Sequence, residues 1–85
     1  MATKDQIKNE IFASMLKRQH GPMTNDIVVI NIVRVALNKK YQYYLDAEEF
    51  NIIGDELVEA GQFRWNDNGQ LALTDIGVIH LGKLK

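Results

Sequence analysis

The sequence predicts a mostly helical α+β fold in which three helices precede a two-stranded hairpin and a short final helix. Apolar residues recur at helical spacing through residues 3–19 and 46–60, and turn-forming residues 66–69 separate two short apolar segments. The 85 residues include 46% hydrophobic and 25% charged side chains, which suits one hydrophobic core. We therefore expect a single domain over residues 1–85.

The first helix is predicted from Thr3 to about Gln19. Thr3 and Gln6 have the spacing of a capping box, in which each side chain binds the other residue's backbone N–H. Three apolar residues then fall on one side of the helix: Ile7, Ile11 and Met15. Gly21 and Pro22 end the helix, because glycine accepts positive φ and proline disfavours a helical residue before it.

The second helix is harder to predict, because residues 28–35 are rich in valine and isoleucine and would also suit a buried strand. The polar residues Asn31, Arg34 and Asn38 favour a helix, since their spacing places them on one narrow stripe. We expect a helix that begins with Thr24 as its cap, ends near Asn38 and is buried on most sides.

The third helix has clear start and stop signals. Asp46 and Glu49 form a second capping-box pair, and Leu45 can pack on Phe50 as a hydrophobic staple. Gly61 can close the helix in a conformation of positive φ.

The hairpin is predicted from strands at 62–66 and 70–74, with the turn Asn66-Asp67-Asn68-Gly69 between them. Thr74 and Asp75 can cap the final helix, although Gly77 and Gly82 weaken it. The predicted core comprises Ile11, Met15, Val29, Ile32, Val33, Phe50, Ile53 and Leu57.

This order of elements, and the residues from 57 to 81, resemble the small bacterial winged-helix domains of PadR- and MarR-type regulators. The resemblance covers the third-helix leucine, the glycines and apolar residues of the wing, and the "LT" that begins the last helix. These residues are Leu57, Gly61, Phe63, Gly69, Leu73, Thr74, Gly77 and Leu81. The resemblance implies DNA binding, with the third helix in the major groove and the wing on the backbone.

The charge of the third helix departs from that implication. The net charge of −1 hides a separation along the chain, because residues 41–63 carry six acidic side chains and no basic one. DNA phosphates would repel such a helix before any base was read. The helix places Ile52 on its outer face among four acidic residues, which is the layout of a protein interface with an apolar centre and a polar rim. The candidate interface residues are Glu48, Ile52, Asp55, Glu56 and Glu59.

The sequence thus favours a non-enzymatic module that binds a separate basic protein or a second copy, which would offer Lys4, Lys8, Lys17 or Arg18. The alternative is a DNA-binding regulator that docks by a basic surface or the wing. Its candidate contacts are Lys39, Lys40, Tyr43, Arg64 and Asn68. That alternative requires the basic side chains to converge on one surface.

The sequence gives little support for metal binding, catalysis or membrane insertion. The chain has no cysteine, and His20 and His80 lack metal-site spacing, so we expect no metal or cofactor. Ser14 lies within a helix without a nucleophile elbow, so we expect neither an enzyme nor a small-molecule substrate. With no signal-peptide pattern and no apolar run longer than residues 27–30, a cytoplasmic, membrane-independent protein is expected.

Overall fold

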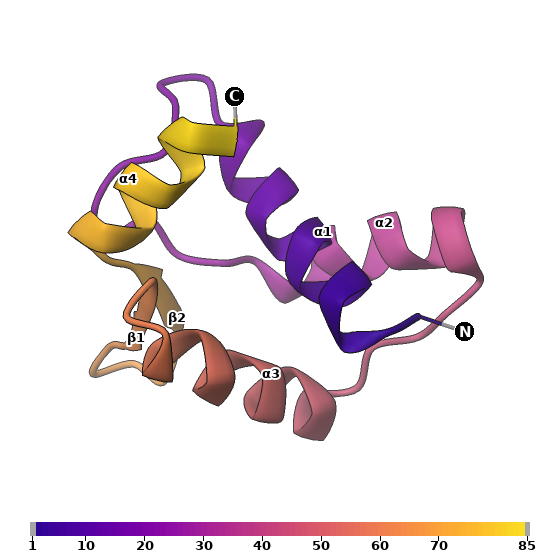
Figure 1. Cartoon of the computed structure of the whole chain (residues 1–85). Coiled ribbons are helices and arrows are strands. Elements are labelled where there is room, and N and C mark those ends of the chain that lie inside the picture. The colour runs from indigo at the N-terminus through magenta and orange to yellow at the C-terminus, as the bar shows by residue number, and fades with distance from the viewer. Residues whose placement is uncertain (1, 85) are drawn as a thin grey trace.

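A computed structural model of the chain describes residues 2–84, and within them the fold is α+β and mostly helical, as predicted (Figure 1). The elements are α1 (Lys4–Leu16), α2 (Ile30–Tyr41), α3 (Ala47–Glu59), β1 (Phe63–Trp65), β2 (Leu71–Leu73) and α4 (Asp75–Leu84). Helix α1 packs against α2, and the hairpin lies at the C-terminal end of α3, between α3 and α4. No helix in the described part of the chain is long and apolar enough to cross a membrane.

The predicted caps of α1 and α4 are present, and at α3 only one half of the predicted capping box is, since the Glu49 side chain accepts from Tyr43 instead. Thr3 and Gln6 form both hydrogen bonds of a capping box at the start of α1. The Asp46 side chain accepts the Glu49 backbone N–H at 2.7 Å and begins α3. Thr74 accepts the Gly77 backbone N–H at 3.1 Å and begins α4. Helix α1 ends at Leu16 and is therefore shorter than the prediction to Gln19.

The hairpin has the predicted turn and slightly shorter strands. Phe63 pairs with Leu73, and Trp65 pairs with Leu71, in an antiparallel register. Gly69 takes a φ of 73°, and Gly61, just after α3, takes a φ of 82°, so both glycines occupy the left-handed region.

The prediction that the second helix begins at Thr24 is wrong, because α2 begins at Ile30. The preceding residues pair with β2 instead: the Val28 N–H donates to the Leu71 carbonyl, and the Leu73 N–H donates to the Asp26 carbonyl. An isolated bridge also joins Ile27 to Ala72. The β-branched residues at the start of this stretch therefore follow their extended propensity, and only the later ones form a helix.

The core lies between the helices and the inner face of the hairpin. Six predicted core residues are buried: Ile11, Met15, Val33, Phe50, Ile53 and Leu57. Val29 and Ile32 are not, with exposed fractions of 42% and 53%, so their placement in the core was wrong. Helix α2 has solvent on one broad face: Val33 and Leu37 are its buried residues, and Ile30 and Tyr41 are partly buried against the core. The prediction that the second helix is buried on most sides is therefore wrong.

Candidate functional site

The outer face of α3 carries most of the candidate interface residues. Phe50, Ile53, Gly54 and Leu57 are buried and fix which way the helix faces. Since side chains recur every 3.6 residues, the opposite side of the helix turns to solvent. Ile52 is 48% exposed there, and Glu48, Asp55 and Glu59 are exposed around it. We call these four residues the α3 outer face.

Glu56 lies at the edge of that face and is engaged within its own chain. Its two carboxylate oxygens accept the Lys4 ammonium at 2.8 Å and the Lys8 ammonium at 2.9 Å. These two hydrogen bonds lower the pKa of Glu56 from 4.5 to about 2, and the bond to Glu56 raises the pKa of Lys4. Glu56, Lys4 and Lys8 thus join α1 to α3, whereas the sequence had suggested that these groups meet across an interface.

Asp55 is held by the hairpin. The Trp65 indole N–H donates to one carboxylate oxygen of Asp55 at 2.7 Å, and the Trp65 ring packs edge-on against Phe50. Gly54 makes room for the indole, since a Cβ there would lie 2.6 Å from its ring. Trp65 therefore seats the hairpin on α3, while the adjacent Arg64 is exposed on the other face of the strand.

The connector before α3 is also tied to the helix. The Tyr43 hydroxyl donates to Glu49, and this bond raises the pKa of Tyr43. Arg34 donates to the Leu45 carbonyl at 2.7 Å and lies over the Tyr44 ring. Tyr43, one of the candidate nucleic-acid contacts, is thus partly buried and bonded, with its ring against the core.

The remaining candidate nucleic-acid contacts come from separate elements. Arg64 on β1 donates to the Asn25 side chain at 3.0 Å, and Asn68 is exposed in the hairpin turn. Lys40, at the end of α2, pairs with Glu10 of α1 at 2.8 Å, and this contact raises the pKa of Lys40. Lys39 is exposed beside it. Among the basic residues of α1, Arg18 donates to the Ile27 carbonyl.

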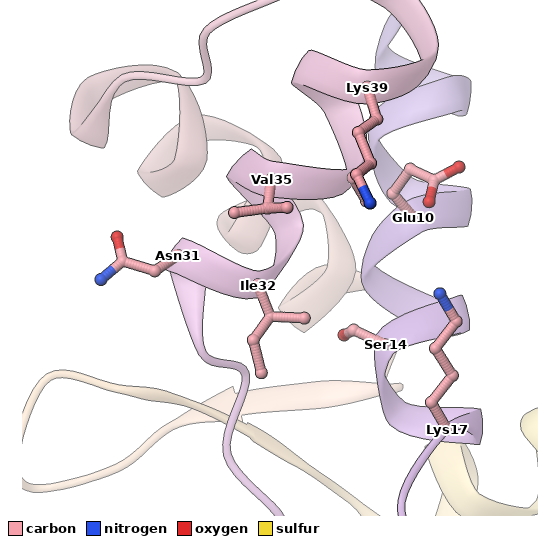
Figure 2. A pocket seen from close by; sticks show the side chains of 8 residues that line it. Glu10, Ser14, Lys17, Asn31, Ile32, Val35 and Lys39 are labelled. Atoms are coloured by element: carbon pink, nitrogen blue, oxygen red, sulfur yellow. The ribbon is translucent and has the colours of Figure 1, made fainter.

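A groove between α1 and α2 is a feature that the sequence reasoning missed. Its volume is about 390 Å³, with an apolar wall formed by Ile32, Val35 and Ala36 of α2. Figure 2 shows Ile32 extending from α2 toward α1, where Ser14 and Lys17 lie, while Asn31 points away. Lys39, Glu10 and Asn31 complete the lining. The spacing of Val29, Ile32 and Val35 marks a stripe in the sequence, but the sequence does not show that this stripe faces water.

No family model, curated protein or solved structure matches this chain.

The side chains considered for metal binding or catalysis lie apart. The His80 ring packs on Phe12 with centroids 4.9 Å apart, and His20 contacts the Gly21 carbonyl. Ser14 donates to the Ile11 carbonyl at 2.6 Å. Within residues 2–84, no group of three or more histidine, aspartate or glutamate side chains could hold a metal ion.

Proposed function

We propose that the chain is a non-enzymatic winged-helix module that binds another protein through the α3 outer face. The winged-helix assignment is supported by the order of its elements and by the pairing of the Ile27 segment with β2 and of β2 with β1. In this arrangement α3 and the hairpin correspond to the recognition helix and the wing. A fold can serve different functions, so the charges of its surface carry the functional argument.

The observation that carries the proposal is the exposure of Ile52 among carboxylates that have no ion-pair partner. Glu48 and Glu59 are exposed and form no ion pair within residues 2–84. An apolar residue with a charged rim suits a protein partner, since the apolar centre contributes affinity and the charges set the rate of association. The same carboxylates would repel the phosphates of duplex DNA.

Photo-cross-linking from position 52 tests the proposal. A benzophenone amino acid placed at Ile52 remains at a half-exposed site, so the fold should tolerate it. After irradiation in cells that express the chain, we expect a covalent adduct to a protein, located by mass spectrometry. Reversing the charge at Glu48 and Glu59 with Glu48→Lys and Glu59→Lys should reduce its yield severalfold.

The same label at Ile79 of α4 is the matched control, because Ile79 is an isoleucine with 62% exposure on another face. Adducts from that position should not respond to the charge reversal on α3. If the yield from position 52 is no higher than from position 79, or if charge reversal leaves it unchanged, the α3 outer face is not a protein-binding surface.

A further inference from the structure

We infer that the groove between α1 and α2 is the docking site for the α3 outer face of a second copy of this chain. In this contact Ile52 enters the apolar part of the groove, while Glu48 and Glu59 face Lys17 and Lys39. The inference rests on the proposed function, because it names the partner of the same α3 surface.

The apolar wall of the groove is exposed to solvent. Ile32 and Val35 lie three residues apart on one side of α2, and their exposed fractions are 53% and 59%. Contiguous exposed apolar surface of this kind marks an interaction site. The groove of about 390 Å³ has room for a branched aliphatic side chain. Ile52 supplies one from the centre of the α3 outer face.

The charges of the two surfaces are opposite. Lys40 neutralises Glu10 at the groove, so the charge that remains there comes from Lys17 and Lys39, which form no ion pair within residues 2–84. Glu48 and Glu59 lie on either side of Ile52, roughly 16 Å apart along α3 at 1.5 Å per residue. Two uncompensated lysines at the groove thus match two uncompensated carboxylates on α3.

Glu10 gives an independent reason to expect an occupant. Glu10 is only 5% exposed. Its Oε2 atom binds Lys40, but its Oε1 atom has no hydrogen-bond partner among the described residues. A buried carboxylate oxygen without a donor costs free energy, which an arriving N–H group would recover. The groove therefore offers an acceptor as well as an apolar wall.

Each copy carries both surfaces, so the contact is heterologous: it closes a dimer when two copies exchange it reciprocally, and otherwise it extends to larger assemblies. The contact is one helix face in a shallow groove, which is at the small end of specific interfaces, and we expect a dissociation constant on the order of micromolar.

Sedimentation over a series of protein concentrations tests the inference on the whole chain. At low salt, about 50 mM, we expect the mass to rise from monomer toward dimer, and this association should weaken at about 500 mM because the pairing charges are screened. Ile52→Asp and Ile32→Asp should each weaken it at least tenfold. Ile79→Asp, a change at a somewhat more exposed isoleucine on α4, should leave it within twofold. Unchanged melting temperatures establish that the variants are folded.

A charge exchange makes the test specific to the two surfaces. One variant combines Glu48→Lys with Glu59→Lys and so has a basic α3 and a basic groove. The other combines Lys17→Glu with Lys39→Glu and has both surfaces acidic. Each variant alone should associate at least tenfold more weakly than the original chain. An equimolar mixture should associate again, because each α3 then meets a groove of opposite charge.

Three results would overturn the inference: a monomer at every concentration, no recovery in the mixture, or equal effects of Ile32→Asp and Ile79→Asp. Cross-linking distinguishes this failure from failure of the proposed function. If the chain is monomeric but the label at Ile52 joins a different protein in a charge-dependent way, only the second-copy assignment is lost. If the label joins no protein, both are lost.

Discussion

Gly77 shows how a single residue sets the distance between α4 and the start of the hairpin. A Cβ at this position would lie 2.1 Å from the Gln62 carbonyl oxygen and 2.6 Å from a methyl of Leu73. The carbonyl belongs to the backbone and cannot turn away as a flexible side chain could. At Gly82, in the same helix, a Cβ would meet no group of the described residues within 4 Å beyond the helix's own backbone.

The two glycines therefore predict opposite effects of the same substitution. Gly77→Ala should destabilise the protein by about 1–3 kcal/mol, because overpacking outweighs the gain of up to about 1 kcal/mol from the higher helix propensity of alanine. Gly82→Ala should be neutral or stabilise by up to about 1 kcal/mol. Urea unfolding of both variants measures the difference. Equal stability of the two would show that α4 can move away from Gln62 without cost.

At the scale of single residues, the sequence predicted the helix caps and the turn glycines. The caps at Thr3, Asp46 and Thr74 and the positive φ of Gly61 and Gly69 depend on residues close in the chain, so local rules were sufficient. Glu56 was placed on the outer face of α3 by the same helical projection. Its pairing with Lys4, 52 residues away, depends on how two helices meet and could not be seen locally.

At the scale of elements, α2 shows where local rules compete. The polar stripe of Asn31, Arg34 and Asn38 correctly indicated a helix, but the β-branched residues before Ile30 pair with β2. The decision between the two depends on an available strand edge, which is a tertiary contact. Arg34 of this stripe donates to the Leu45 carbonyl. The stripe therefore contacts the connector before α3 as well as solvent.

The contact between α1 and α3 predicts a pH dependence of stability through Glu56. Its pKa is about 2 in the folded chain against an ordinary 4.5, so folding favours the ionised carboxylate. The resulting stability is present above pH 4.5 and is lost as the pH falls through about 2. Glu56→Gln should therefore lower the melting temperature at neutral pH. The difference from the original chain should shrink below pH 4.5 and vanish near pH 2.

Glu59→Gln is the matched control, since Glu59 is exposed on the same helix and forms no ion pair within residues 2–84. Thermal melts followed by circular dichroism across this pH range provide the measurement. High salt should reduce the effect of Glu56→Gln in part, because Lys4 is 59% exposed whereas Lys8 is only 25% exposed. A difference that stays constant with pH would mean that Glu56 contributes through packing and not through its charge.

At the scale of the whole molecule, the sequence showed which segments are acidic and which are basic, but not how the folded chain uses these charges. The basic first half suggested several lysines and arginines able to meet a partner. In the fold, Lys4 and Lys8 bind Glu56, Lys40 binds Glu10, and Arg18 and Arg34 bind backbone carbonyls. The acidic outer face of α3, by contrast, was predicted correctly for Glu48, Asp55 and Glu59, because the amphipathic pattern of one helix determines it.

This internal use of basic side chains predicts weak binding to duplex DNA. A plot of the logarithm of affinity against the logarithm of salt concentration has a negative slope. Each phosphate that a protein neutralises makes this slope more negative by about 0.9. Lys17 and Lys39 are the two lysines at the α1–α2 groove that form no ion pair within residues 2–84. Arg64 and Lys83 are also exposed and form no ion pair within residues 2–84, so titration of a labelled duplex should give a slope no steeper than about −4 and a dissociation constant of roughly 10⁻⁴ M at physiological salt. Lys17→Glu with Lys39→Glu should flatten the slope further. Tight binding with a slope near about −6 would instead require the existing ion pairs to open onto phosphates, and would favour a regulator that contacts DNA through Lys39, Lys40, Tyr43, Arg64 and Asn68.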